Sequence, residues 1–115
     1  MKIPNLDKAE IRRAKISDYL LSLIHPDGGG KAGFFTQFGF SSGEWEELVQ
    51  ALLRHATEHE IVKTEDSPYG LRYVVDGELQ TPDGRTPNIR AVWFVESGED
   101  SPRFVTAYPL RRRKP

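Results

Sequence analysis

One string in the first third of the chain carries residue types that phosphate chemistry uses. Residues 25–31, HPDGGGK, place an ionisable imidazole at His25, a glycine turn after it, and Lys31 at the start of the next expected helix. The N–H groups of such a turn and a lysine ammonium can hold a phosphate. The spacing G-x-x-x-x-G-K-[ST] is absent, so a nucleoside-triphosphate loop is not expected. The alternative, which composition alone favours, is a helix–turn–helix connection with His25 as a C-terminal cap.

A second set of candidates is scattered through the last third of the chain. It consists of three arginines and two hydroxyl residues: Arg85, Arg90, Arg103, Thr106 and Tyr108. Guanidinium groups match phosphate oxygens with two hydrogen bonds, and hydroxyls can bind a phosphate or a ribose. The pattern alone favours ordinary sheet surface, with the arginines paired to Asp76, Glu78 or Glu96.

The remaining reactive types form no recognisable catalytic set. His55 and His59 have the i, i+4 spacing of a zinc pair but lack the H-E-x-x-H pattern, so an exposed pair near a helix end is expected. There is no cysteine, which excludes disulfides, thiolate zinc sites and cysteine nucleophiles. We therefore expect neither a metal nor a cofactor.

Hydrophobic periodicity predicts helices first and strands afterwards. Capping-box spacings at Asp7 and Ser41, with a segment at 17–25 and another at 32–38, indicate helices, of which the clearest runs to about residue 58. Alternating segments at 61–65, 71–76, 88–96 and 103–108 indicate strands joined by short turns. The order predicts an α+β fold, N-terminal helices packed on a four-stranded antiparallel sheet, with one domain over residues 1–110 and a basic tail at 111–115.

Alternation also predicts which side chains share a face of the sheet. On the third strand Ile89 and Trp93 point to the opposite side from Arg90. If Val105 and Ala107 pack on the helices with Ile89 and Trp93, then Phe104, Thr106 and Tyr108 share the other face with Arg90; a bulge would reverse this assignment.

The charge balance separates the body from the tail. Sixteen Lys and Arg against seventeen Asp and Glu give −1, and without the four cations at 111–114 twelve cations face seventeen acids, or −5. No apolar run is long enough to cross a bilayer and no signal peptide is visible, which predicts a cytoplasmic protein without membrane contact. An acidic body disfavours RNA binding, which benefits from a positive field.

Two strings carry a resemblance to known proteins. Residues 25–40, HPDGGGKAGFFTQFGF, and 84–109, GRTPNIRAVWFVESGEDSPRFVTAYP, resemble a bacterial family of unknown function, and the opening IPNLDKAEI is similar to it as well. The same late pattern resembles the C-terminal modules of polymorphic bacterial toxins in the barnase–EndoU–colicin–RelE class of ribonucleases.

That resemblance implies a metal-independent endoribonuclease without a cofactor. His25 is implied as general acid or base, Lys31 and Arg90 as stabilisers of the phosphorane-like transition state, Thr106 as a hydrogen-bond donor to phosphate or ribose, and Tyr108 as a base-stacking residue or proton donor. Arg85 and Arg103 are implied as substrate-binding residues. The implied partners are an RNA substrate and a cognate antitoxin or immunity protein. Ala91 departs from the hydroxyl residue that relatives carry after the arginine. The alternative function is a non-catalytic binding or immunity-type protein, which the acidic body favours.

Overall fold

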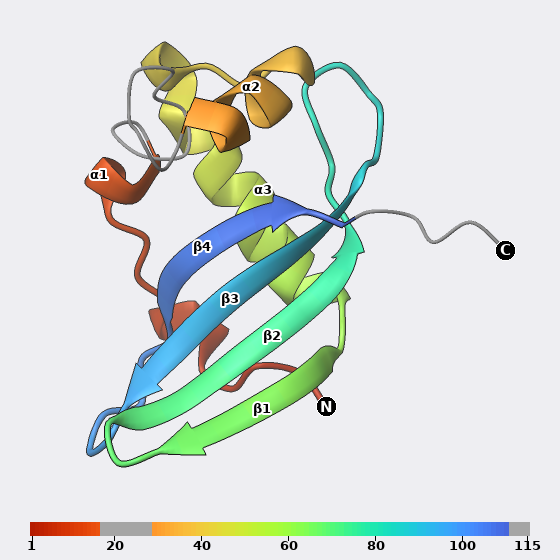
Figure 1. The fold of residues 1–115 in the computed structure, drawn as a ribbon. Helices are drawn as coiled ribbons and strands as arrows, with labels where there is room; N and C mark the ends of the chain where they lie inside the picture. Colours follow the sequence, from red (N-terminus) through yellow and green to blue (C-terminus); the bar gives the residue numbers. More distant parts are fainter. Residues whose placement is uncertain (17–28, 111–115) are drawn as a thin grey trace, which may run out of the picture.

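The computed structural model describes residues 1–16 and 29–110 and has the predicted α+β architecture (Figure 1). Short helical turns come first, then two longer helices, and then four strands. The elements are η1 (Leu6–Lys8), α1 (Arg13–Lys15), α2 (Gly29–Gln37), η3 (Ser42–Glu44), α3 (Trp45–Glu58), β1 (Ile61–Ser67), β2 (Gly70–Glu78), β3 (Asn88–Glu96) and β4 (Arg103–Pro109). No helix among the described residues is long and apolar enough to cross a membrane.

The four strands form one antiparallel meander in the order β1-β2-β3-β4, as predicted. The β1–β2 hairpin is tighter than expected, because Ser67 pairs directly with Gly70 and only Pro68 and Tyr69 form the loop. Gly70 has a φ of +148°, and a Cβ there would lie 2.9 Å from the Phe94 ring. A glycine is therefore required where β2 begins.

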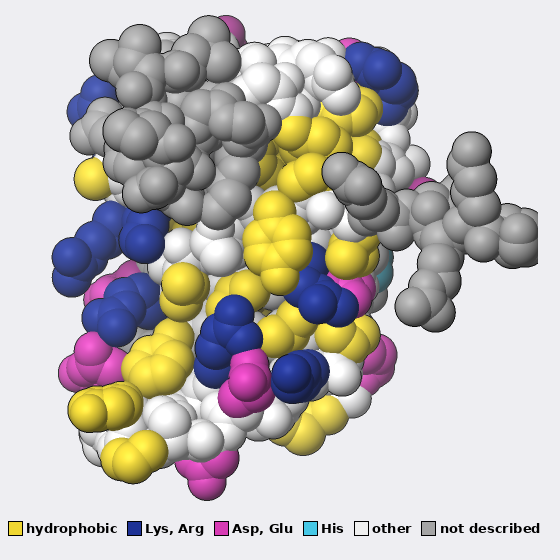
Figure 2. Space-filling model, in the orientation of Figure 1, with side chains coloured by type: hydrophobic (Ala, Val, Ile, Leu, Met, Phe, Trp, Pro, Cys, Tyr) yellow, Lys and Arg dark blue, Asp and Glu magenta, His cyan; other side chains and the backbone are white. Residues whose placement is uncertain are grey.

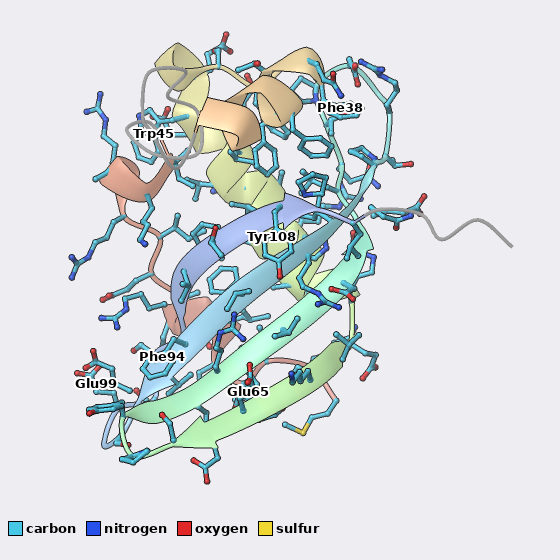
Figure 3. All side chains as sticks on the ribbon, viewed as in Figure 1. Phe38, Trp45, Glu65, Phe94, Glu99 and Tyr108 are labelled. Atoms are coloured by element: carbon cyan, nitrogen blue, oxygen red, sulfur yellow. The ribbon has the colours of Figure 1, made fainter. Side chains whose placement is uncertain are left out.

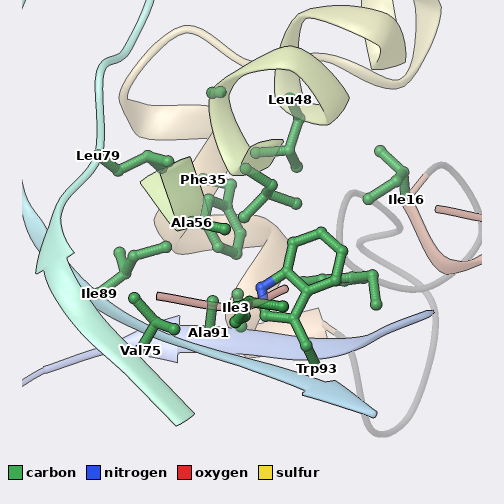
Figure 4. Packing of buried hydrophobic residues seen from close by; sticks show 14 of the residues in the cluster. Ile3, Ile16, Phe35, Leu48, Ala56, Val75, Leu79, Ile89, Ala91 and Trp93 are labelled. Atoms are coloured by element: carbon green, nitrogen blue, oxygen red, sulfur yellow. The ribbon is translucent and has the colours of Figure 1, made fainter. Parts of the chain in front are cut away.

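One face of the sheet packs on α3 and α2 (Figure 4). The stripe of α3 residues at Leu48, Leu52 and Ala56 is fully buried, and so are Ile89 and Trp93 on the facing sheet. The Trp93 and Phe104 rings meet edge to face, with centroids 5.4 Å apart. This covered face is the hydrophobic core. The opposite side of the sheet, which we call the open face, is covered by none of the helices that the structure describes.

A bulge in β4 changes part of the predicted face assignment. Val92 pairs with Thr106 and Trp93 with Phe104, so Val105 is an extra residue on β4. Because of it Phe104 turns into the core, which is the opposite of the prediction, and Val105 is not one of the core residues. Ala107 lies in the core as predicted.

The predicted helix starts differ from those observed. Ser41 precedes the short turn η3 and makes no capping side-chain hydrogen bond, and Glu44 precedes α3 without one. No capping box forms at Asp7 either, since η1 follows Asn5 in the left-handed region with φ 58°. α2 begins at Gly29, three residues early, and Gly39 with φ +102° ends it. The segment predicted at 17–25 lies outside the described residues.

The N-terminal segment touches both edges of the sheet. The Ile61 N–H donates to the Met1 carbonyl at 2.7 Å on the β1 edge. At the β4 edge Glu10 forms a parallel bridge to Arg103, with the Phe104 N–H donating to the Glu10 carbonyl at 2.9 Å. The first ten residues therefore run from one outer strand to the other.

Candidate functional site on the open sheet face

Three predicted site residues share the open face of the sheet. Arg90 on β3 lies directly opposite Tyr108 on β4, and Thr106 lies opposite Val92 one step along the same pair of strands. Figure 3 shows Tyr108 lying over the centre of this face. The predicted grouping of Arg90, Thr106 and Tyr108 on one face is confirmed, because the bulge at Val105 precedes Thr106 and leaves the later register intact.

Asp76 on β2 fixes the guanidinium of Arg90. Its two carboxylate oxygens accept hydrogen bonds from Arg90 Nε at 2.7 Å and Nη2 at 2.8 Å. Hydrogen bonds to Asp76 and then to Tyr108 raise the pKa of Arg90 above its ordinary value. Arg90 is thus a permanently charged group with a fixed orientation, and its charge is balanced by one carboxylate. Asp76 is one of the three carboxylates that the sequence indicated as partners of these arginines, and this pairing is confirmed.

The other strand cations on the open face are paired in the same way. Arg72 and Lys63 both reach Glu65, the latter at 3.9 Å, and Arg103 reaches Glu96 at 3.0 Å. Dark blue and magenta side chains therefore lie next to each other across this face in Figure 2. The long side chains cover apolar neighbours: Val92 is 0% exposed although none of the described helices lies above it.

Arg103 and Arg85 lie away from Arg90. Arg103 pairs with Phe94, four residues along β3 from Arg90, and its guanidinium lies 6.0 Å from the centre of the Phe94 ring. Arg85 lies in the β2–β3 loop, where Nη2 donates to the Gln37 carbonyl at 2.9 Å and the guanidinium stacks on Phe38 at 4.4 Å. Arg85 therefore ties this loop to α2.

Asp83 anchors the same arginine from within the loop. Its Oδ2 accepts from Arg85 Nε at 2.7 Å, and the hydrogen bonds from Arg85 lower the pKa of Asp83 to about 2. The predicted site residues are thus divided between the Arg90 group, the Arg103 end and the Arg85 loop. His25 lies outside the described residues, and for Lys31 only the backbone, in the first turn of α2, is described.

The histidine pair at the end of α3 is not exposed as expected, since His55 is buried and His59 is half-buried. His55 is 1% exposed, and because a carbonyl can only accept, its Nε2–H donates to Gly77 O at 3.1 Å. His59 Nδ1–H donates in turn to the His55 carbonyl at 2.8 Å. Burial, with the neighbouring His59, lowers the pKa of His55 to about 4. Both rings therefore join the end of α3 to β2, and the described residues contain no cluster of three metal-ligating side chains.

A hollow of about 440 Å³ between α3 and the β2–β3 loop was not anticipated from the sequence. Its lining is partly apolar, with Phe40 and Ala51, and partly charged, with Glu46, Glu47 and Arg54. None of the predicted site residues lines it.

Comparison with known proteins places the chain in a family. Residues 2–111 match the model of the family described as domain of unknown function DUF6883. The chain belongs to this family. No curated protein matches it. The expectation of a family of unknown function is confirmed, while its bacterial origin and the ribonuclease class remain predictions.

The DUF6883 chain also shares its fold with a solved structure. A chain of a contact-dependent growth inhibition toxin–immunity protein complex from Klebsiella pneumoniae 342 aligns with a TM-score of 0.71 and 17% identity, over 87% of this chain and 98% of that one. At this identity the likeness establishes a common fold, and the side chains of the open face must carry any functional argument.

On that face the DUF6883 chain combines a fixed cation with two hydroxyl groups. Arg90 can donate to an anionic oxygen, and the hydroxyls of Thr106 and Tyr108 lie on the same pair of strands. This arrangement suits stabilisation of a phosphate whose negative charge increases during reaction.

Proposed function

We propose that this DUF6883 chain is a toxin-type endoribonuclease that cleaves RNA without a metal on the open sheet face. The observation that carries the proposal is the side-by-side placement of Arg90, Thr106 and Tyr108 on β3 and β4. The fold shared with a chain of a toxin–immunity complex supports a place in such a system.

The proposed reaction is attack of an RNA 2′-hydroxyl on the adjacent phosphorus. The P–O5′ bond breaks, which leaves a 2′,3′-cyclic phosphate and a 5′-hydroxyl. The proton of the 2′-hydroxyl goes to a general base, and the departing O5′ receives a proton from a general acid. His25 serves in one of these roles, and its ordinary pKa of about 6.5 suits transfer in either direction near neutrality.

The other residues act on the phosphate and its neighbours. Arg90 and Lys31 stabilise the charge that accumulates on the non-bridging oxygens, and Thr106 donates a hydrogen bond to phosphate or ribose. Tyr108 stacks on a base or donates the proton. Asp76 acts through Arg90 as a positioning residue, since its hydrogen bonds to Nε and Nη2 fix the orientation of the guanidinium before any substrate binds.

The test is RNA cleavage in the presence of EDTA. We expect tRNA or total RNA to yield fragments ending in 2′,3′-cyclic phosphate, and Arg90→Ala to lower the rate by about 100-fold or more. Arg54→Ala is the matched control, because Arg54 is an exposed arginine of α3, ion-paired to Glu58 at 3.0 Å. Intact RNA at high concentrations of folded wild-type protein would rule out the nuclease.

An immunity-type binding protein is the second candidate, and the charge pairing on the open face favours it. Each of the four strand cations there has a carboxylate partner, which leaves a nearly balanced surface with Phe94 and Tyr108 between the charges. Such mixed surfaces with aromatic residues are typical of protein interfaces. Co-purification with a basic nuclease that the chain inhibits supports this candidate, whereas toxicity of the chain expressed alone contradicts it.

A further inference from the structure

A separate hollow of about 240 Å³ lies at the outer edge of β4. Arg12 and Lys15 line it from the N-terminal segment, and Arg103, Phe104 and Val105 line it from the strand. Figure 2 shows Lys and Arg side chains gathered on the left of the molecule, where Figure 1 places α1 and the start of β4. We call this hollow the β4-edge pocket.

Backbone pairing brings these cations together from distant parts of the sequence. Glu10 bridges to Arg103, its N–H donates to the Pro102 carbonyl at 2.9 Å, and its carbonyl accepts from the Phe104 N–H. The residues that follow Glu10 therefore run beside β4, and Arg12 and Lys15 reach the same hollow as Arg103. The bulge residue Val105 forms part of the wall.

The β4-edge pocket differs in charge from the open face. Of the five lining residues within the described part of the chain, three are cationic and none is acidic. Glu96, the carboxylate that pairs with Arg103, is not among the described lining residues. A small hollow lined by two arginines and a lysine suits a phosphate group.

We propose that the β4-edge pocket binds a backbone phosphate of the RNA strand, away from the phosphate that is cleaved. This inference rests on the proposed function and specifies its substrate class: an RNA strand of several nucleotides rather than a dinucleotide.

Arg103 connects the two places. It lines the pocket, yet its guanidinium also lies above the Phe94 ring on the open face, and β4 continues from it to Thr106 and Tyr108. An RNA strand that runs from Tyr108 along β4 passes Phe94, on which a base can stack, before it reaches the pocket.

The experiment measures binding of a 2′-O-methyl RNA 12-mer, which lacks the nucleophilic hydroxyl and stays intact, by fluorescence anisotropy at several salt concentrations. Arg12→Ala/Lys15→Ala is compared with Lys2→Ala/Arg54→Ala, a control that removes the same charge from exposed positions elsewhere. We expect binding about tenfold weaker than in the control, and a slope of log K against log salt that is less negative by about 0.7 for each phosphate that the variant no longer neutralises. Arg12→Ala alone gives a smaller change in the same direction and guards against misfolding of the double variant.

The outcomes separate this inference from the proposed function. Equal affinity in the pocket variant and the control overturns the pocket assignment, even if wild-type protein cleaves ordinary RNA in a parallel assay. Weaker binding in the pocket variant upholds the assignment, even if the parallel assay shows no cleavage and so overturns the nuclease. No RNA binding by wild-type protein, or a pocket variant that is weakened only toward an acidic protein, overturns the phosphate as the pocket's ligand.

Discussion

The two faces of the sheet are built from alternate residues of the same strands, yet they differ in what shields their apolar residues from water. On the covered face Ile89, Ala91 and Trp93 are all fully buried against helices. On the open face Arg90, Val92 and Phe94 follow one another at every second position. Val92 is buried there although none of the described helices covers it. Long charged side chains that pair with one another can thus cover an apolar residue of a sheet where no described helix covers it.

The two faces of the sheet contribute differently to stability. Apolar area removed from water stabilises the covered face by about 25 cal/mol per Å². Ion pairs that remain partly in water contribute little, so the open face can change its side chains at small cost in stability. A candidate site is best placed where substitution is tolerated, and the largest effects on folding should come from the other side of the sheet.

The largest contrast is expected between two adjacent residues of β3. Trp93→Ala removes a fully buried indole that packs on Phe104 and should lower the free energy of unfolding by about 4 kcal/mol. Phe94→Ala, on the half-buried open face, should lower it by about 1 kcal/mol. Urea denaturation of both variants measures the difference. Equal decreases would mean that the open face is packed like a core.

The second largest effect is a pH dependence of the free energy of unfolding, which His55 causes on the helix side of the sheet. The pKa of His55 is about 4 in the folded chain and about 6.5 when unfolded, so only the unfolded chain takes up this proton between those values. The contribution of His55 to the free energy of unfolding is complete above about pH 6.5 and falls as the pH drops. By about pH 4 it has decreased by about 3 kcal/mol.

Urea denaturation of the wild type and of His55→Gln across this pH range isolates that contribution, because the carboxylates titrate equally in both proteins. His59→Gln is the comparison: it removes the second cause of the lowered pKa of His55 and should keep most of the dependence, because burial is the largest cause. An unchanged pH profile in His55→Gln would show that His55 does not cause it.

A smaller effect is expected where β2 passes the end of α3. A Cβ at Gly77 would overlap the His59 ring, so Gly77→Ala should destabilise the fold by about 1–2 kcal/mol. The penalty should disappear in a His59→Ala background, which removes the ring. Gly43→Ala is the matched control, since a Cβ there meets nothing within 4 Å. Thermal unfolding of the wild type, the two single variants, the double variant and the control checks this, and a penalty that persists without His59 would place the clash elsewhere.

The smallest effect is expected from the Arg90–Asp76 pair of the open face. A double-mutant cycle with Arg90→Ala and Asp76→Ala should give a coupling energy of about 1 kcal/mol at low salt, because solvent screens a side chain that is 37% exposed. The exposed Arg54–Glu58 pair should give about 0.3–0.5 kcal/mol. A coupling above about 3 kcal/mol would show that the open face is shielded from water.

The strands were largely predictable, since alternation is a local property of the sequence. The range 88–96 was predicted at its observed bounds because Ile89, Ala91 and Trp93 recur at every second position of an apolar segment that ends before a clear turn. The bulge at Val105 was not predictable, because the residues from Phe104 to Ala107 offer apolar side chains to either face. Only pairing with β3 decides which of them turns inward.

The buried histidine had a signal that was missed. His55 lies seven residues after Leu48, on the same stripe of α3, so its burial follows from the helical period. The Asp76–Arg90 contact was one of the pairings that the sequence indicated, with Asp76, Glu78 and Glu96 as candidate carboxylates, but the register between β2 and β3 decides which of them Arg90 meets. The convergence of Arg12 and Arg103 depends on pairing between the two ends of the sequence, which no local pattern encodes.

The N-terminal segment that touches both outer strands sets an order on folding during synthesis. Met1 and Glu10 are synthesised before the sheet, but Glu10 finds its partner only when β4, the last strand of the meander along the chain, has joined it. The hairpins between neighbouring strands can form early because their partners are close in sequence, whereas closure at Glu10 spans most of the chain and comes late. The β4-edge pocket, which needs that closure, would therefore be the last part of the molecule to assemble.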